Sequence, residues 1–340
     1  MIYRSKAPLR IGLAGGGTDV SPYCDLYGGA ILNATISLYA NASIEPLKEQ
    51  RIILETNDRN ELQEFDFTHE LPLDGDLDLL KGVYNCIRKD HGAIKTGFRL
   101  STFVDAPAGS GLGTSSTLVV AIIGAFAEMM GLPLGEYDIA HYAYQVERNY
   151  LNLAGGRQDQ YAATFGGVNF MEFYENDKVI VNPLRIKEQY LFELENNLVL
   201  YYTSTTRESA KIIEQQSRNV TSKKEQPIAA MHLLKQQSQM MKEALLKGKL
   251  HEFGEILDYG YQQKIKMAEG ISNPLMEEIY QTAKSAGATG GKISGAGGGG
   301  FMIFYCPGTS RYNVIKSLER FGGYYKTYQF VEHGLKTWTI

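Results

Sequence analysis

A glycine- and hydroxyl-rich segment at residues 107–117, Pro-Ala-Gly-Ser-Gly-Leu-Gly-Thr-Ser-Ser-Thr, constrains the fold more than any other part of this chain. An alternating apolar run at 98–104 leads into the segment and is typical of a strand. A nearly continuous apolar run at 118–130 follows and indicates a buried helix that ends at Gly131 and Pro133. The predicted order is therefore strand, glycine loop and helix N-terminus.

This segment has the features of a phosphate-binding loop. Gly109, Gly111 and Gly113 let the backbone turn tightly, and hydroxyl residues stand at 114–117, where the helix begins. The unpaired N–H groups and the positive dipole end of a helix favour an anion such as phosphate. A glycine turn with an N-capping hydroxyl is the simpler alternative. The segment lacks the Gly-Lys-Ser/Thr of a Walker A loop, and Thr114 replaces the third glycine of a Rossmann fingerprint.

A second glycine loop, at 15–17, follows a short predicted strand near the start of the chain. Consecutive glycines permit positive φ and the close approach of a ligand, although a simple turn is the alternative. Thr18 and Asp19 come directly after the loop, where a carboxylate suits hydrogen bonds to sugar hydroxyls. Arg10, just before the loop, is a candidate for fixed positive charge.

A third glycine loop, at 287–300, contains eight glycines and lies between a predicted helix at 273–286 and a predicted strand at 301–305. It includes the spacing Gly-x-Gly-x-x-Gly, but the order helix, loop and strand is the reverse of a Rossmann unit. Its place between two regular elements favours an ordered loop over a flexible linker.

Two acidic residues follow the central loop. Glu147 stands beside the apolar stripe of an amphipathic helix predicted at 136–153, and a solvated glutamate is its ordinary interpretation. Asp159 belongs to the segment Gly-Gly-Arg-Gln-Asp-Gln-Tyr at 155–161, where it is either a positioned carboxylate or the cap of the next helix. The residues alone leave both alternatives open.

Together these segments resemble three motifs of the GHMP kinases, the galacto-, homoserine, mevalonate and phosphomevalonate kinases. The three are Pro-x-Arg-x-x-x-x-Gly-Gly-x-Thr-Asp, Pro-x-x-x-Gly-Leu-Gly-Thr-Ser-Ser and Lys-x-Ser-Gly-Ala-Gly-Gly-Gly-Gly, spread from residue 8 to 301. The resemblance implies a two-domain α+β fold with the nucleotide in the cleft between domains. An N-terminal ribosomal-S5-like domain is expected at 1–190, and a C-terminal ferredoxin-like α/β sandwich at 191–340.

The resemblance also implies roles in phosphoryl transfer, which needs positioning and charge neutralisation. Asp159 would orient the acceptor hydroxyl and take its proton, and Arg10 would favour the ionised carboxylate and offset charge. Ser115 and Glu147 would bind Mg²⁺, which prefers oxygen ligands. The residues expected at the ATP phosphates are Pro107, Gly109, Ser110, Gly111, Leu112, Gly113, Thr114, Ser115, Ser116, Gly297 and Gly298. Those expected at the sugar are Gly17, Thr18, Asp19, Arg157 and Asp159.

Within the family, Gly-Gly-Gly-Thr-Asp-Val and Gly-x-Gln-Asp-Gln-Tyr resemble the D-glycero-D-manno-heptose 7-phosphate kinases, which phosphorylate the anomeric C1 oxygen toward nucleotide-heptose synthesis. A phosphate remote from C1 is therefore expected on the sugar, with Arg157 and Arg207 as spare cations near it. Arg157 is otherwise an ordinary surface charge or a partner of Asp159. A fucokinase- or galactokinase-like kinase of a free sugar, a decarboxylase and a non-catalytic ATP and sugar sensor stay open. The Thr18–Asp19 pair does not suit the isoprenoid acids of the decarboxylases.

Composition narrows the class of protein. The chain has 340 residues, enough for two domains, and a net charge of −4 without a basic block, which argues against a nucleic-acid partner. Cys24, Cys86 and Cys306 are widely spaced and predict buried thiols in a reducing compartment. The apolar run at 118–130 is too short to span a bilayer, and the N-terminus lacks a signal-peptide pattern. We expect a cytoplasmic monomer or homodimer that binds ATP, Mg²⁺ and a small sugar phosphate but no membrane.

The remaining patterns predict the other elements. Strands are expected at 29–46 and 51–56, irregular structure at 57–78 and a helix at 79–90. A polar stretch at 185–196 is the expected domain boundary. Further helices are predicted at 206–217, 226–247, 250–268 and 310–321, and strands at 168–173, 178–184, 324–331 and 335–339.

Overall fold

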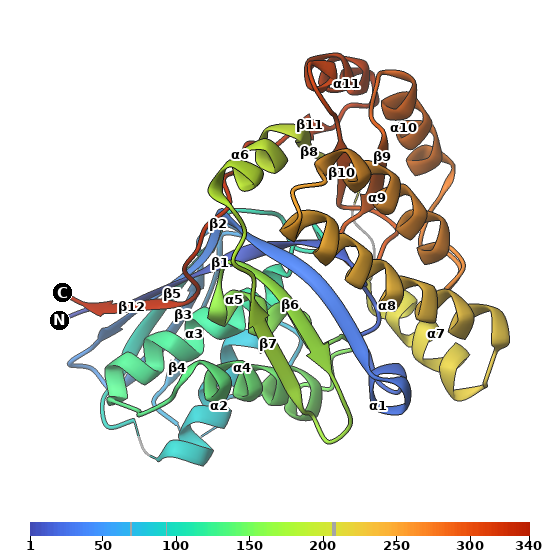
Figure 1. Cartoon of the computed structure of the whole chain (residues 1–340). Coiled ribbons are helices and arrows are strands. Elements are labelled where there is room, and N and C mark those ends of the chain that lie inside the picture. Colours follow the sequence, from blue (N-terminus) through green and yellow to red (C-terminus); the bar gives the residue numbers. More distant parts are fainter. Residues whose placement is uncertain (69, 93, 206–208) are drawn as a thin grey trace.

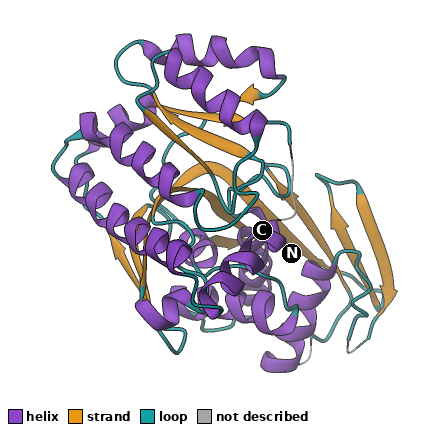
Figure 2. Cartoon of the chain, turned by 90° about the vertical axis from the view of Figure 1, so that its right-hand side faces the viewer, coloured by secondary structure: helices purple, strands orange, loops and turns teal. Residues whose placement is uncertain are grey.

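The computed structural model describes residues 1–68, 70–92, 94–205 and 209–340 (Figure 1). The described chain forms two sheets with accompanying helices, an α+β arrangement that confirms the predicted fold class. In the view of Figure 2, strands run through the middle of the molecule and helices lie on either side of them.

The first sheet is built on β2, an 18-residue strand at Gly29–Pro46. One edge of β2 pairs with β1, Tyr3–Ala14. The opposite edge is shared between β6, Val168–Phe173, and β5, Phe98–Val104. The strand order is β12-β1-β2-β5-β3-β4, with β7 beyond β6, and the other bounds are β3 Arg51–Thr56, β4 Glu61–Asp66, β7 Val179–Pro183 and β12 Lys336–Thr339.

Helix α3, Thr114–Met130, lies against β1 and β2 and is the buried helix expected after the central loop. Its residues 116–126 are all buried, which explains why the sequence there is apolar without a polar face. Gly131 ends the helix in the left-handed conformation. The other helices of this part are α1 Tyr23–Tyr27, α2 Asp78–His91, α4 Glu136–Gln145, the π-helical turn η1 Val146–Tyr150, α5 Gln158–Phe165 and α6 Glu188–Asn197.

The second sheet is antiparallel, with the strand order β11-β8-β10-β9. Its strands are β8 Leu198–Tyr202, β9 Gly290–Ile293, β10 Phe301–Tyr305 and β11 Tyr324–Tyr325. The accompanying helices are α7 Ser209–Thr221, α8 Glu225–Leu246, α9 Leu250–Lys264, α10 Pro274–Ser285, α11 Ser310–Leu318 and the 3₁₀ turn η2 Glu319–Phe321. Helix α10 begins as expected, with Asn273 accepting a hydrogen bond from the Met276 N–H and Pro274 in the first turn.

One apolar core joins the two parts. The buried cluster that contains Ile11 of β1 and Leu32 of β2 continues into Leu245 of α8, Phe253 of α9 and Phe301 of β10. Such a continuous, close-packed core resists relative sliding of its members. It therefore fixes the positions of loops that come from opposite ends of the sequence.

The C-terminal segment returns to the first sheet, as the adjacent chain ends in Figure 1 show. Strand β12 pairs with residues 3–6 of β1, and the Val331 N–H donates to the carbonyl of Thr35 over 3.1 Å. This finding departs from the predicted division, which assigned all of 191–340 to the second domain. The sequence of the tail carries no sign of which sheet it joins, because strand pairing is a non-local property.

Two other segments differ from the sequence-based predictions. Residues 57–78 were expected to be irregular, but β4 pairs with β3 there as an edge strand. Four of its six side chains are exposed and three of these four are charged, so the apolar alternation that marks a half-buried strand is weak. The polar stretch expected as a boundary contains helix α6, in which Leu194 and Asn197 are buried.

The cysteines meet the prediction of buried thiols. Cys24, Cys86 and Cys306 are free, and burial raises the pKa of the Cys86 thiol to about 11. Thiols of this kind are inert at neutral pH because little thiolate is present.

No helix within the described ranges is long and apolar enough to cross a membrane.

Candidate active site

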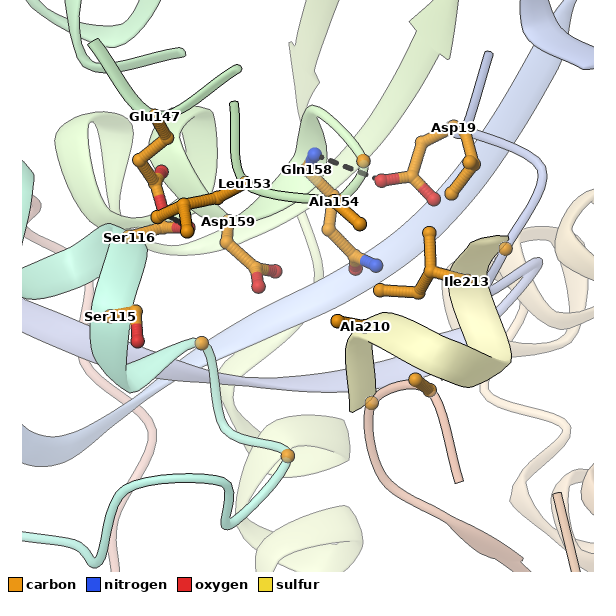
Figure 3. A pocket seen from close by; sticks show the side chains of 18 of the residues that line it. Asp19, Ser115, Ser116, Glu147, Leu153, Ala154, Gln158, Asp159, Ala210 and Ile213 are labelled. Atoms are coloured by element: carbon orange, nitrogen blue, oxygen red, sulfur yellow. Dashed lines mark hydrogen bonds between the residues drawn. The ribbon is translucent and has the colours of Figure 1, made fainter. Parts of the chain in front are cut away.

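A cavity of about 290 Å³ lies where the two domains meet (Figure 3). The first domain contributes Arg10, Gly17, Asp19, Val20, Gly109, Gly111, Gly113, Thr114, Ser115, Ser116, Glu147, Arg148, Leu153, Ala154, Gly155, Gly156, Gln158 and Asp159. The second domain contributes Ala210, Ile213, Gln216, Lys264, Gly295 and Ala296. The cavity therefore gathers residues of all three glycine loops and both predicted acidic positions.

The central loop and the first turn of α3 form one wall. Gly109, Gly111 and Gly113 have positive φ, as the tight turn was expected to require. The first turn of α3 faces the cavity through Thr114 and Ser115, so its free N–H groups are available to an anion. The predicted loop residues Pro107, Ser110 and Leu112 do not line the cavity; Ser110 and Leu112 are buried behind it.

Asp159 lies in the first turn of α5 and points into the cavity (Figure 3). Its Oδ1 accepts a hydrogen bond from Arg10 Nε over 2.7 Å, and Arg10 Nη2 forms an ion pair with the same oxygen at 2.6 Å. Arg10 Nη1 also donates to the carbonyl of Gly111 over 2.6 Å, which ties the pair to the central loop. The guanidinium thus neutralises the carboxylate and fixes its orientation beside the phosphate-binding wall.

Asp19 lies across the cavity from Ser115 in Figure 3, with Gln158 between them. Its Oδ2 accepts from the backbone N–H groups of Arg157 and Gln158, over 2.9 and 3.1 Å. Burial raises the pKa of this carboxyl, and the two backbone donors partly oppose the rise. Asp19 is therefore a rigidly held acceptor that lines the cavity, and its role at the sugar stays a prediction.

Glu147 is buried in the π-helical turn η1 and faces the start of α3. Its Oε1 accepts from the Ser116 hydroxyl over 3.0 Å, and Gln160 Nε2 donates to Oε2. Desolvation by burial raises the pKa of the Glu147 carboxyl. Ser115 was predicted to bind Mg²⁺ together with Glu147, and that role stays a prediction. The hydroxyl that contacts Glu147 directly is that of Ser116, because neighbouring residues of a helix point about 100° apart.

Thr18 and Arg157 depart from the predicted sugar site. The Thr18 hydroxyl is buried and donates to the carbonyls of Gly15 and Ala30, so this residue shapes the first loop. The Arg157 guanidinium turns away from the cavity and pairs with Asp25 at 2.9 Å and Asp177 at 2.8 Å. It does not line the cavity. Arg207, the other expected cation, lies outside the described residues.

Arg157→Met should therefore lower stability rather than sugar affinity. The guanidinium is buried and links α1 to the β6–β7 hairpin, so its loss removes the donor from the Tyr174 carbonyl and from two half-buried carboxylates, Asp25 and Asp177. We expect a loss of roughly 1.5–3 kcal/mol in the free energy of unfolding, which is the range for hydrogen bonds to charged groups. Urea denaturation measures it. An unchanged midpoint with a raised sugar KM would restore the original prediction.

The third glycine loop reaches the cavity through Gly295 and Ala296 rather than through the predicted Gly297 and Gly298. Gly298 N–H donates to the carbonyl of Ile271 over 2.7 Å, and a Cβ at Gly297 would lie 2.7 Å from the same oxygen. These two glycines therefore shape the turn that carries Gly295 to the central loop. Their predicted contact with the nucleotide stays a prediction.

Several lining residues were not foreseen. Ala210, Ile213 and Gln216 come from α7, and Lys264 is the last residue of α9. Their helices were predicted, but the helical patterns gave no sign of which residue faces another domain. Gln158 was overlooked although it adjoins Asp159, and its Oε1 is buried without a hydrogen-bond partner in the described structure.

Comparisons with known proteins agree with this arrangement. Residues 78–167 match the model of the GHMP kinases N terminal domain, and residues 241–323 match that of the GHMP kinases C terminal domain. The chain is 48% identical to D-glycero-alpha-D-manno-heptose 7-phosphate kinase of Campylobacter jejuni, over 99% of both chains. It is also 29% identical, over 87% of its length and 34% of the relative's, to the L-fucokinase/L-fucose-1-P guanylyltransferase of Bacteroides fragilis.

The fold has a close counterpart among solved structures. A crystal structure described as a D-glycero-D-manno-heptose 1-phosphate kinase from Bacteroides thetaiotaomicron superposes with a TM-score of 0.85 at 44% identity, over 99% of both chains. The loops that line the cavity, the two matched domain models and the full-length relatives lead to one conclusion. This chain belongs to the GHMP kinase family and is an ATP-dependent phosphotransferase with an alcohol group as acceptor.

Proposed function

We propose that this kinase transfers the γ-phosphoryl group of ATP to the anomeric C1 hydroxyl of D-glycero-D-manno-heptose 7-phosphate, giving the 1,7-bisphosphate. The observation that carries the proposal is the Arg10–Asp159 pair, held between the phosphate-binding wall and the Asp19 carboxylate. The full-length likeness to a heptose 7-phosphate kinase supports the choice of sugar.

In this proposal each side chain has one task. The first turn of α3 and the central loop hold the phosphates of ATP through backbone N–H groups. Asp159 accepts a hydrogen bond from the C1 hydroxyl and takes its proton as the O–P bond forms. Arg10 keeps Asp159 aimed at the hydroxyl and offsets the negative charge of the transferring group. Asp19 and Gln158 bind hydroxyls on the sugar ring.

The residues also suit Mg²⁺. Glu147 supplies a carboxylate and Ser116 a hydroxyl, both oxygen donors, at the start of the phosphate-binding helix. Mg²⁺ commonly takes only one or two carboxylates and fills its other positions with phosphate oxygens and water. In agreement, the described residues contain no group of three or more His, Cys, Asp or Glu side chains able to hold a metal by themselves. The ion, when bound, would neutralise charge on the ATP phosphates.

Glu147→Gln and Ser116→Ala should each raise the Mg²⁺ concentration needed for half-maximal activity, with the larger change for Glu147→Gln. A neutral amide is a weaker ligand for a hard cation than a carboxylate. Ser115→Ala is the matched comparison, because Ser115 lines the cavity without contacting Glu147. Titrating Mg²⁺ at fixed ATP separates the three. Equal Mg²⁺ curves for wild-type enzyme and Glu147→Gln would overturn the metal assignment.

The acceptor is tested by ADP release in a coupled assay. Heptose 7-phosphate, heptose 1-phosphate, free heptose, mannose, fucose and galactose are compared at equal concentration, because the two relatives' names differ in the position of the phosphate. We expect the fastest turnover with heptose 7-phosphate, and a new anomeric phosphate signal in the ³¹P NMR spectrum of the product. Faster turnover of a free sugar would replace the proposed acceptor, and no ADP release with any sugar would favour a sensor.

A further inference from the structure

Three cationic side chains line the described part of the cavity, Arg10, Arg148 and Lys264, and Lys264 is the one without a carboxylate at ion-pair distance. Arg10 pairs with Asp159 at 2.6 Å, and Arg148 Nη1 lies 3.6 Å from Glu147 Oε1. In the described part of the chain, no carboxylate oxygen lies within the 4.0 Å ion-pair distance of Lys264 Nζ. The side chain is only 3% exposed, and its ammonium group donates to the carbonyl of Gly295 over 2.6 Å.

A buried ammonium without an anion is costly, because the charge loses its hydration without gaining a partner. Desolvation accordingly lowers the pKa of Lys264 to about 8, with Asp19 opposing the shift and Arg10 adding to it. Lys292, which donates to the carbonyl of Gly12, is a second buried lysine nearby, and repulsion from Lys264 contributes to its own lowered pKa. Two buried lysine side chains and Arg10 therefore lie close enough together to repel one another at this end of the cavity.

The Lys264 ammonium group lies beside the first glycine loop. A Cβ at Gly16 would lie 3.5 Å from Lys264 Nζ, and a Cβ at Gly17 would lie 3.5 Å from Gln216 Oε1. Glycine at position 16 leaves room for about one methyl group beside Lys264 Nζ, whereas at position 17 the Met267 methyl group lies 2.6 Å from where a Cβ would be. Gln216 is buried and lines the same cavity. Lys264, Gln216 and Asp19 line the same cavity, and Asp19 lies on the opposite side of Asp159 from Ser115 (Figure 3).

We propose that Lys264 and Gln216 form the subsite for the acceptor's own phosphate, the group remote from the hydroxyl that reacts. This inference rests on the proposed function, since it assumes a sugar phosphate as acceptor. A lysine binds phosphate as a point charge, and its remaining N–H donors are free to do so once one is used on Gly295. The phosphate would place an anion within ion-pair distance of Lys264, so that a residue of the second domain distinguishes a phosphorylated from a free sugar.

The test compares phosphorylated and free heptose in matched variants. Lys264→Gln removes the charge but keeps a donor for the Gly295 carbonyl, and Lys264→Arg keeps the charge. Lys266→Gln is the control, because Lys266 is exposed just beyond the same helix and bonds only to Gln263 among its described neighbours. Arg218→Gln tests an alternative position for the phosphate subsite. This position is a neighbouring cavity of about 470 Å³ that is lined by Arg148 and Arg218.

We expect Lys264→Gln to raise the KM for heptose 7-phosphate by about 10- to 100-fold, the usual effect of losing a charge-assisted contact. The KM for ATP, and the KM or Ki for free heptose, should stay unchanged. Lys264→Arg should recover much of the affinity, and Lys266→Gln should match the wild type. Gln216→Glu should raise the KM for heptose 7-phosphate but not for free heptose, because the new carboxylate repels the phosphate. This variant provides the test if Lys264→Gln does not fold.

The outcomes separate the two proposals. Wild-type enzyme that phosphorylates no sugar phosphate overturns the proposed function and this inference with it. A wild-type preference for heptose 7-phosphate, together with equal effects of Lys264→Gln on phosphorylated and free heptose, overturns only the subsite. A raised KM for ATP would assign Lys264 to the nucleotide, and a selective effect of Arg218→Gln alone would move the subsite to the neighbouring cavity.

Discussion

Asp159→Asn is expected to lower kcat by about two to four orders of magnitude, the range that a positioned general base contributes. The substitution keeps an oxygen for the Arg10 hydrogen bonds and changes little in size. It removes the ability to accept the proton of the acceptor hydroxyl. Because Asp159 lies at the first turn of α5 and not in the phosphate-binding wall, the KM for ATP should change much less than kcat.

Asp25→Asn is the matched control for this prediction. Asp25 is a carboxylate of the same chain that pairs with Arg157 outside the cavity, and Asp177 holds the same guanidinium. Its loss should leave kcat near the wild-type value. Single-turnover kinetics with saturating ATP report the chemical step directly. A folded Asp159→Asn enzyme with wild-type single-turnover rate would remove Asp159 from the mechanism.

Gly295→Val should lower kcat/KM by about 5- to 140-fold, because the added side chain pushes the third loop away from the central loop. Gly295 has a φ of 68°, and a Cβ there would lie 2.7 Å from the Cα of Gly111. The neighbouring Ser294 hydroxyl donates to the Gly111 carbonyl over 2.8 Å. Left-handed strain lowers the stability of the fold. Overpacking of about 1–3 kcal/mol, relieved by moving the two loops apart, corresponds to about 5- to 140-fold in kcat/KM at 1.4 kcal/mol for each factor of ten.

Gly308→Val distinguishes strain from contact between the loops. Gly308 has a φ of 61°, close to that of Gly295, but a Cβ there would meet no atom within 4 Å. This control should lose stability through backbone strain and keep its kcat/KM. Thermal unfolding and steady-state kinetics are measured on both variants. If Gly295→Val loses no more activity than Gly308→Val, the contact between the central and third loops is unimportant for catalysis.

The predictable part of the site came from local patterns with strict backbone demands. The central loop needs glycine to turn and a buried helix behind it, and both are visible in the order of residues around Gly111 and Gly113. The three loops were predicted to meet, and Gly17, Gly111 and Gly295 do line one cavity. The prediction that the three loops meet came from the resemblance to the family motifs, because the spacing alone does not indicate that residues 17 and 295 lie close together.

Side-chain direction was the part that local patterns could not supply. Ser115 and Ser116 are chemically the same, and only the rotation of α3 against η1 decides which hydroxyl meets Glu147. Arg157 is two residues from Asp159, yet residues so spaced at a helix start face different ways. Lys264 had no local signal, because its role as a lining residue depends on how α9 lies beside a loop from another domain.

The strand pairing of β12 with β1 has a consequence for protein synthesis. The chain is synthesised from its N-terminal side, so β1 is made before β12. One edge of β1 therefore stays unpaired until residues 336–339 have been synthesised. An unpaired strand edge invites association with other chains. The first sheet is completed only after the helices and strands of the second domain have been synthesised, because β12 follows them in the chain. We therefore expect nascent chains stalled before β12 to bind holdase chaperones more strongly than full-length chains do.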